Sequence, residues 1–503
     1  MALPISLFAW TLVLTWLGLK LYTLIFNIYF HPLRKYPGPL RAAATTWWRT
    51  YIEAFKKENW TDVLIRLHEE YGDVVRVEPN EVLHFSKPSA YHDIYNSTAR
   101  WNKDSFLYEC FGVEKSSFGF LTYNEAKLRR DVLQPLFSRR AILGMQSLVR
   151  QNIDHLAGAL AKNNEDGVPS DLFSAFHAFT LDTITTFCFA RSTNAMDAPG
   201  FMASIIESVQ AATSSNMLFK HFPLLRKTIF SLPPWLACRV SPATAGVPKF
   251  RLALERQIKQ FMANPESLKN QPHPIIYHRL LDPEAQKDHP VLGPIDLLHE
   301  AHTLLGAGSD TVGNTLMTGF FHILSQPSLY ARLQEEVLTV WPHLHDPPKL
   351  ETLEALPLLT AATKEALRMT PAVPSPCTRV VPATGATISG MEIPPGTVVG
   401  MSSILVHNSS EIFKSPEVYD PDRWLAGDSH MLDQGFVPFS KGPRSCLGIN
   451  LAWCELYIAF ATMLRRFEMR IDGTVVEDLV WRDCFVPHYY GKHLQAWCQP
   501  VTT

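Results

Sequence analysis

Cys446 lies in a stretch with the composition of a tight loop that leads into a helix. It follows Gly442-Pro443-Arg444, precedes Gly448, and is close to a helical apolar pattern that begins at Ile449. Both glycines permit positive φ and close backbone approach, and the proline stiffens the turn. The helix N-terminus would point unpaired N–H groups at the sulfur, which favours a thiolate. The stretch therefore predicts a chemically active sulfur.

Two ordinary explanations of Cys446 compete with that prediction. A lone cysteine is more often a small core residue, and a zinc site needs further Cys or His ligands. The sequence near Cys446 offers no such ligands. Other motifs must therefore decide what the sulfur does.

The centre of a predicted helix over residues 294–325 is a second unusual stretch. It contains Gly306, Gly308 and Gly313, each of which costs about 1 kcal/mol of helix stability relative to alanine. Asp310 and Thr311 add a carboxylate and a hydroxyl. We expect the glycines to let something large approach the backbone, and the helix groove to be locally widened there.

Together these motifs resemble those of the cytochrome P450 family. The run Phe439-x-x-Gly442-x-Arg444-x-Cys446-x-Gly448 is similar to the family's haem-binding signature. Three further motifs occur in the family's order, and they are Ala307-Gly308-x-Asp310-Thr311, Glu365-x-x-Arg368 and Pro421-Asp422-Arg423-Trp424. The resemblance extends over essentially the whole chain. It is closest to the microsomal class of filamentous fungi, which often serves secondary-metabolite pathways.

The resemblance implies a role for each candidate residue. Cys446 would bind the iron of haem b, and its thiolate would favour O–O cleavage. Thr311 would hold a proton-delivering hydrogen bond at the oxygen, with Asp310 linking it to solvent. Glu365, Arg368 and Arg423 would brace the loop that carries Cys446. The implied cofactor-binding residues are Arg130, Arg379 and Arg444 at the propionates, together with Phe439 and Gly308.

Two positions depart from the family pattern. Ala126 stands where the family usually has Trp or His, four residues before Arg130, so one propionate hydrogen bond is expected to be missing or replaced. Val312 follows Thr311 in place of the common Thr or Ser. This second change leaves the main hydroxyl in place.

Periodicity predicts a mainly α protein with small β-sheets. The resemblance implies the cytochrome P450 fold, with haem between a long central helix and the loop bearing Cys446. The predicted helices are 60–71, 125–137, 139–160, 172–189, 200–216, 248–262, 294–325, 328–340, 358–369 and 449–467. The predicted strands are 74–77, 82–85, 378–381, 387–388 and 398–402.

The N-terminus predicts a membrane anchor. Lys20 is the only charged residue between Ala2 and Phe30, which is long enough for a spanning helix. A basic, proline-rich stretch follows, so we expect residues 1–30 to form the anchor, 31–41 a hinge and 42–503 the catalytic domain. The positive-inside rule places that domain in the cytosol, and we expect a single pass through the endoplasmic reticulum membrane. A buried hydrophobic helix is the alternative.

Composition narrows the range of partners. A net charge of −2 gives no general electrostatic reason to bind nucleic acid. Eight cysteines without CxxC spacing, in a chain of 503 residues, indicate reduced sulfur that faces the cytosol.

The electrons must come from a partner, because the sequence has no GxGxxG dinucleotide-binding segment. The resemblance implies an NADPH-cytochrome reductase in the membrane, with cytochrome b5 as an optional second donor. The basic residues that could meet an acidic flavoprotein are Lys127, Arg129, Arg139, Arg140 and Lys441. Solvated surface charges are the alternative explanation of these residues.

The expected function is a haem-dependent monooxygenase that oxidises a lipophilic small molecule, such as a terpenoid, polyketide or alkaloid. Substrate contacts are expected from residues 101–121, 302–307, 372–376 and 484–487, which are largely apolar and aromatic. One alternative is a haem-thiolate isomerase or dehydratase that needs no oxygen, against which Asp310 and Thr311 argue. A non-catalytic haem-binding sensor is the other.

Overall fold

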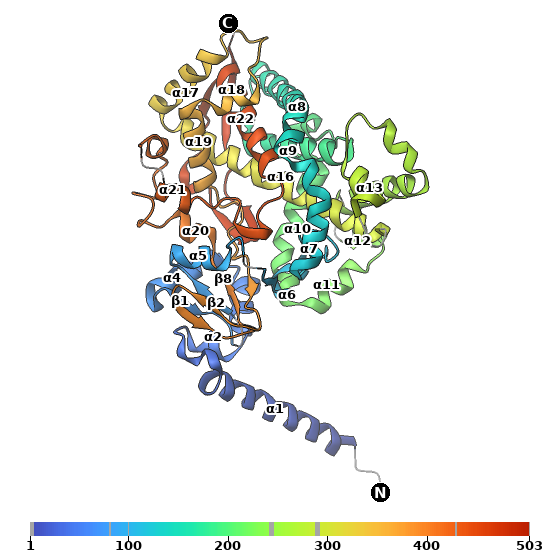
Figure 1. Cartoon of the computed structure of the whole chain (residues 1–503), viewed down its shortest axis with the longest axis vertical. Coiled ribbons are helices and arrows are strands. Elements are labelled where there is room, and N and C mark those ends of the chain that lie inside the picture. Colours follow the sequence, from blue (N-terminus) through green and yellow to red (C-terminus); the bar gives the residue numbers. More distant parts are fainter. Residues whose placement is uncertain are drawn as a thin grey trace.

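The computed structural model describes residues 5–79, 82–98, 100–240, 246–286, 292–427 and 430–501. It is mainly helical with small sheets, as the sequence predicts. Helix α16 runs through the middle of the molecule, the sheet with β1, β2 and β8 lies below it on the side of α1, and α1 extends away from the rest (Figure 1). The first four residues of the predicted anchor lie outside the described part.

The α-helices that the structure describes are α1 Ile5–Tyr29, α2 Leu40–Ala44, α3 Trp47–Thr50, α4 Trp60–Tyr71, α5 Pro88–Ile94, α6 Ser105–Tyr108, α7 Tyr123–Leu133, α8 Arg139–Glu165, α9 Leu172–Phe189, α10 Ser204–His221, α11 Pro223–Phe230, α12 Pro234–Val240, α13 Gly246–Ala263, α14 Ile276–Leu280, α15 Pro283–Gln286, α16 Pro294–Leu324, α17 Pro327–Val340, α18 Leu350–Glu354, α19 Pro357–Met369, α20 Ser403–His407, α21 His430–Gly435 and α22 Ile449–Arg466. The strands are β1 Val74–Arg76, β2 Val82–Phe85, β3 Asn102–Lys103, β4 Ser170–Asp171, β5 Arg379–Val380, β6 Ala386–Ile388, β7 Met391–Ile393, β8 Val398–Gly400, β9 Phe467–Ile471, β10 Trp481–Cys484, β11 Val486–Tyr489 and β12 Gln495–Pro500.

All ten predicted helices are present. The bounds of α4 and α9 match the prediction, whereas the others differ by a few residues at their ends. The five predicted strands are also present, but the sequence did not predict the C-terminal strands β9 to β12. Those strands are short, and β10, β11 and β12 lack a clear alternation of apolar and polar residues, so no local pattern marks these three strongly.

The core is built around α16, which packs against α9 and α22. The Phe320 ring lies between Phe176 of α9, at a centroid distance of 5.4 Å, and Phe460 of α22, at 5.0 Å. Two glycines allow α9 to approach closely. A Cβ added to Gly308 would lie 2.5 Å from the Ile184 side chain, and one added to Gly313 would lie 3.1 Å from Nδ1 of His177.

A five-stranded sheet of order β1-β2-β8-β5-β3 lies on the N-terminal side. Strands β3 and β5 are antiparallel, and their register places Lys103 directly opposite Arg379. Like charges in directly opposed positions destabilise a sheet. This pairing therefore needs an explanation from the site that the two residues adjoin.

Helix α1 is long and apolar enough to cross a membrane. Its segment from Phe8 to Tyr29 is only 6% buried, which is compatible with a single-pass anchor. Helix α9 passes the same test of length and composition but is 94% buried, so it is a core helix. All eight cysteines are free, in agreement with the prediction of reduced sulfur.

Candidate functional site

The Cys446 loop is held by its own backbone. The N–H of Cys446 donates to the carbonyl of Phe439 at 2.9 Å, and the N–H of Ser445 donates to the carbonyl of Gly442 at 3.0 Å. Gly442 has a φ of +74°, and a Cβ there would lie 2.5 Å from the Asn96 carbonyl oxygen. The predicted positive φ is therefore confirmed at this glycine. It is wrong at Gly448, where φ is −86°.

The side chain of Cys446 is exposed, yet protein closely surrounds it. Both observations hold if the sulfur faces an internal space instead of bulk solvent. Burial raises the pKa of the Cys446 thiol, although the Gly448 N–H and the charge of Arg130 act in the opposite direction. The predicted preference for thiolate is thus outweighed by desolvation. A coordinated metal would hold the sulfur as thiolate by displacing its proton.

The middle of α16 carries an uncovered strip. Gly306 and Ala307 are exposed and Thr311 is partly exposed, within a helix whose other side is buried. The Thr311 hydroxyl donates to the carbonyl of Ala307 at 3.0 Å, which is the usual contact of a helical threonine and leaves its oxygen able to accept. The helix is regular throughout, so the predicted local widening is absent.

Asp310 and Gly308 lie on the side of α16 that faces α9. The side chain of Asp310 is 14% exposed and faces α9, where its Oδ1 lies 3.9 Å from Nε2 of His177. The missing side chain of Gly308 makes room for Ile184 of α9. The sequence grouped Gly308 with the cofactor-binding residues. In the structure the group that lies against this glycine is the Ile184 side chain, and the cofactor-binding role of Gly308 stays a prediction.

Four basic residues form a cluster, which we call the cation cluster, and they are Lys103, Arg130, Arg379 and Arg444. Lys103 and Arg379 are buried, and Arg130 and Arg444 are partly exposed. Burial lowers the pKa of Lys103 well below its usual value, and the charges of Arg444, Arg379 and Arg130 lower it further. Burial, followed by the charge of Arg379, lowers the pKa of Arg444 to about 10. The four charges thus repel one another in a poorly solvated place.

The cation cluster has no directly paired carboxylate among the described residues, although Glu300 and Asp131 act on Arg130 from a distance and backbone carbonyls accept from both Nη atoms of Arg444. Among the described residues, none of the four forms a salt bridge with a carboxylate. Lys103 Nζ donates to the Phe118 carbonyl at 2.6 Å, and Arg379 Nη1 donates to the Tyr108 hydroxyl at 3.1 Å. Nε of Arg444 is buried and has no hydrogen-bond partner in the described part of the chain. Such a donor set suits a ligand with carboxylate groups, as haem has in its two propionates.

The sequence did not predict Lys103, the fourth member of the cation cluster. No motif marks this lysine, and the signal that identifies it is its register position opposite Arg379. Ala126 is fully buried and offers no side-chain donor, as expected from its type.

A second buried arginine cluster lies behind the Cys446 loop, and we call it the bracing cluster. Arg368 meets both carboxylate oxygens of Glu365, at 2.7 and 3.0 Å, and Arg423 meets one of them at 3.1 Å. Arg368 also donates to the His407 carbonyl at 2.9 Å, and the His407 ring accepts from the Val437 N–H at 3.0 Å. Val437 lies just before the Cys446 loop. The contacts agree with the predicted bracing.

Three of the aromatic residues predicted to line a substrate site, Phe111, Phe118 and Phe485, meet at one place, whereas Phe106 lies beside Arg49. The ring of Phe485 lies 4.7 Å from that of Phe111 and 5.7 Å from that of Phe118. Phe485 sits at the tip of the β10–β11 hairpin with a φ of +78°, a strained conformation for a bulky residue. Glu300 of α16 accepts from the Ser117 N–H at 2.8 Å and fixes the loop that carries Phe118.

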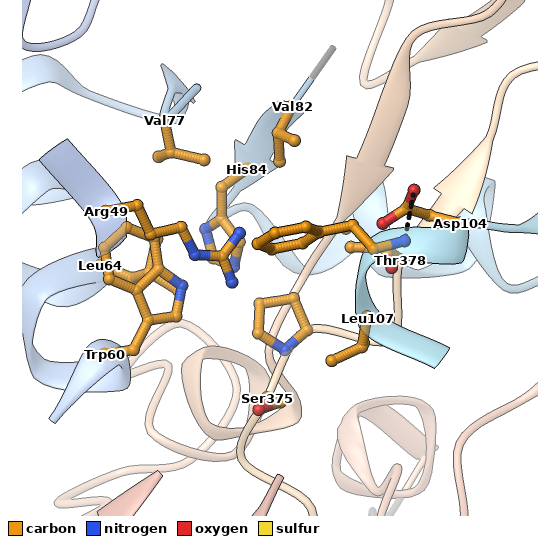
Figure 2. A pocket seen from close by; sticks show the side chains of 13 residues that line it. Arg49, Trp60, Leu64, Val77, Val82, His84, Asp104, Leu107, Ser375 and Thr378 are labelled. Atoms are coloured by element: carbon orange, nitrogen blue, oxygen red, sulfur yellow. Dashed lines mark hydrogen bonds between the residues drawn. The ribbon is translucent and has the colours of Figure 1, made fainter. Parts of the chain in front are cut away.

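A cavity of about 20 Å³ lies apart from these residues, between α4, the sheet and α6 (Figure 2). Arg49, which lines it, lies between the rings of Trp60 and Phe106 at 4.6 and 5.3 Å. Its guanidinium already pairs with Glu78 at 2.6 Å and with Glu53 at 3.3 Å. This cation is satisfied by protein, so the cavity has none of the unmet charge of the cation cluster.

The predicted docking face for a reductase is only partly present. Arg129 is buried and pairs with Glu300 at 3.3 Å, so it cannot present charge to a partner. Lys127 pairs with Asp131, and Arg139 pairs with Glu354 at 2.5 Å. Helical periodicity alone did not reveal that Arg129 turns inward while its neighbours face solvent.

Known proteins resemble this chain over most of its length. Cytochrome P450 monooxygenase flvC of Aspergillus flavus is 34% identical, with 97% of this chain and 95% of that protein covered. Cytochrome P450 monooxygenase macH of Penicillium terrestre is 33% identical, with 93% of each chain covered. Tryptophan 6-hydroxylase fscE of Fusarium equiseti is 34% identical, with 89% of this chain and 88% of that protein covered.

A family-wide comparison gives the same result. The cytochrome P450 family matches residues 42–484, and its members use haem b with electrons from a reductase, which is typically NADPH-dependent. The fungal relatives are monooxygenases, as the motifs around Cys446 and Thr311 imply. This chain is therefore a member of the cytochrome P450 family and a haem monooxygenase.

Proposed function

We propose that this P450 oxidises a lipophilic small molecule of fungal secondary metabolism, with Cys446 as the ligand of the haem iron. The observation that carries the proposal is the combination of an inward-facing cysteine with the cation cluster, whose members form no salt bridge with a carboxylate of the described residues. A thiolate and two propionates are the anions that these groups would meet. The members of the bracing cluster are the residues that keep the loop in place.

The cation cluster would hold the haem by its propionates. Arg379 would present its guanidinium to a carboxylate and Arg444 would present its Nε, because both Nη atoms of Arg444 already donate to backbone carbonyls. Lys103 and Arg130 would neutralise charge beside them. Phe439 shapes the Cys446 loop through its carbonyl and packs its ring 6.0 Å from that of Trp453. When bound, haem with a thiolate ligand activates molecular oxygen and inserts one oxygen atom into an organic substrate.

Thr311 and Asp310 would deliver protons to the site. The Thr311 hydroxyl lies on the uncovered strip of α16, where it can exchange its bond to Ala307 for one to a ligand. Asp310 is the residue before Thr311, so its side chain is rotated by about 100° around the helix axis and faces α9. Asp310 would therefore receive protons on one side of α16 and Thr311 would position them on the other.

The aromatic cluster of Phe111, Phe118 and Phe485 would form an apolar wall for the substrate. It adjoins the cation cluster, because the Phe118 carbonyl accepts from Lys103. A relative is named as a tryptophan 6-hydroxylase, which shows that a fungal protein similar to this chain acts on an aromatic substrate. We infer a lipophilic substrate whose ring or chain packs against these phenyl rings.

The iron-ligand assignment is tested with Cys446→Ser. A serine hydroxyl cannot supply an anionic sulfur, so the thiolate-type absorption band of the reduced carbon monoxide complex should disappear, and NADPH-dependent product formation should disappear with it. Cys454→Ser is the matched control, because that cysteine is fully buried in the core and should leave the band in place. Retention of the band in Cys446→Ser would refute the assignment. Product formation without oxygen or reductase would instead favour an isomerase.

We also propose that α1 anchors the protein in the endoplasmic reticulum membrane with the catalytic domain in the cytosol. Removal of residues 1–30 takes away the exposed apolar helix and should shift the protein from the membrane to the soluble fraction. The shortened chain should still bind haem, since none of the proposed site residues lies in this segment. Protease protection of a tag before residue 5 in intact microsomes would test the orientation, and a tag that is digested would contradict it.

A further inference from the structure

A small polar cavity lies on the side of α16 to which Asp310 points. It has a volume of about 20 Å³, enough for one water molecule. Helices α9, α10 and α16 and strand β11 enclose it. The lining residues are Phe173, His177, Gln210, Thr213, Asp310, Asn314, Pro487, His488 and Tyr489.

Two lining groups lack partners that buried polar atoms normally have. Oδ1 of Asn314, a residue that is 1% exposed, accepts no hydrogen bond from the described residues, and Nε2 of Gln210 donates none. One atom is an acceptor and the other a donor, so a single water molecule in the cavity could satisfy both. Gln210 and His488 are partly exposed, which leaves the cavity close to the surface.

The tautomer of His177 is set by its helix. Its Nδ1 lies 2.7 Å from the carbonyl oxygen of Phe173, which can only accept, so Nδ1 carries a proton. The neutral ring therefore turns the lone pair of Nε2 toward Oδ1 of Asp310, 3.9 Å away. That distance is too long for a direct hydrogen bond but suits exchange through water or a small side-chain movement.

We propose that His177 is the proton donor to Asp310, supplied by water in this cavity. The inference rests on the proposed role of Asp310 and extends it to a residue on a different helix. A proton moves from solvent to Nε2, which makes His177 an imidazolium while Nδ1 keeps its bond to Phe173. It then moves to the carboxylate of Asp310, which becomes a neutral acid as His177 returns to the neutral ring.

The electrostatics of the site agree with such a transfer. Burial raises the pKa of Asp310, whereas His177 and the Ser309 hydroxyl act to lower it. Burial lowers the pKa of His177, which Asp310 and Asp171 raise and His493 lowers. Both groups are therefore shifted toward the neutral pair, so a proton that reaches Asp310 is not strongly drawn back.

A purely structural role for His177 is the competing explanation. The ring stacks on Phe173 at a centroid distance of 4.0 Å and fills the space above Gly313. Phenylalanine would preserve both contacts, so a filler role predicts that His177→Phe behaves like the wild type. His493→Phe is the matched control, because His493 stacks on the same Phe173 ring at 4.0 Å but pairs with Asp171.

The first measurement is infrared spectroscopy of the resting, haem-loaded full chain. The carboxylic-acid band of Asp310 is identified as the band that Asp310→Asn removes, and it is followed as the pH rises. In His177→Phe no imidazolium can form beside the carboxyl, and because that charge lowers the pKa of Asp310, the band should persist to a higher pH than in the wild type. His493→Phe should titrate like the wild type. An unchanged midpoint in His177→Phe would overturn the proposal.

The second measurement is product formed per NADPH consumed, with hydrogen peroxide assayed in parallel. His177→Phe should lower this ratio by about tenfold and raise peroxide, because proton supply is interrupted. His177→Gln keeps a polar side chain that cannot carry a proton, so it should be as poorly coupled. If glutamine restored coupling, proton transfer through His177 would be refuted.

The two measurements separate this inference from the proposed function. A wild type without product would count against the proposed monooxygenase reaction, while the infrared titration would still report whether Asp310 and His177 interact. If His177→Phe did not bind haem, His177→Gln would take its place in the infrared experiment, because glutamine cannot form an imidazolium either.

Discussion

The two buried arginine clusters of this protein differ in how their charge is balanced. In the bracing cluster, the Glu365 carboxylate pairs with Arg368 and Arg423, and backbone carbonyls accept from other guanidinium donors. In the cation cluster, Lys103 faces Arg379 across two strands and no protein carboxylate compensates them within the described residues. A protein-satisfied cluster serves the fold, whereas an unsatisfied one is built for a ligand. Substitutions in the two clusters should therefore have opposite effects on the haem-free protein.

The largest effect is expected from Glu365→Gln. The side chains of Glu365 and Arg368 are fully buried, so loss of the carboxylate charge leaves two arginines without compensation. Breaking a buried pair in this way costs about 3–5 kcal/mol. Urea unfolding should show this loss with and without haem.

The control for Glu365→Gln is Glu354→Gln, which breaks the pair with Arg139, a residue whose side chain is 52% exposed. Exposed pairs contribute at most about 1 kcal/mol. Equal losses in both variants would show that the bracing cluster is an ordinary ion pair.

Lys103→Met should have a smaller effect, which is stabilising in the haem-free protein and unfavourable for haem binding. Removal of one of two directly opposed like charges should stabilise the haem-free protein by up to about 1 kcal/mol. The same variant should release haem faster to an acceptor protein, because a partner of the propionates is lost. Lys127→Met is the control on an exposed helix face. Destabilisation of the haem-free protein by Lys103→Met would place Lys103 with the structural residues.

The smallest expected effect is a pH dependence of the free energy of unfolding of the haem-free protein. Burial and three neighbouring cations lower the pKa of Lys103 in the folded protein well below 10.5, the ordinary value that the unfolded chain keeps. Between the folded and the unfolded pKa, the unfolded chain binds a proton that the folded chain has released. The free energy of unfolding of the haem-free protein should therefore rise with pH over that window. Urea unfolding between neutral pH and about pH 10.5 measures the rise. Lys103→Met and the haem-loaded protein should lack it, and a rise of the same size in Lys103→Met would assign it to other groups.

The difference between the clusters also marks the limit of what the sequence could predict. Glu365 and Arg368 are one helical turn apart, so their pairing follows from local spacing, and the Cys446 loop follows from Gly442 and Pro443 just before the cysteine. Lys103 and Arg379 are far apart in the chain, and only the register of β3 and β5 brings them together. Likewise, Gly308 serves contact with Ile184 of α9, which depends on how two distant helices cross. Local pattern identifies motifs, but long-range pairing decides which residues share a charge or a surface.

The apolar helix α9 stays uncovered for part of the synthesis of the chain. It is apolar enough to cross a membrane, yet its main partner, α16, begins about a hundred residues later in the sequence. At about 5–20 residues per second, this segment waits roughly 5–20 s during synthesis before α16 exists to cover it. A nascent chain already held at a membrane by α1 would expose a second insertable segment during that interval. Asp182 and the threonines of α9, buried in the finished protein, give the segment polar groups that disfavour transfer into lipid.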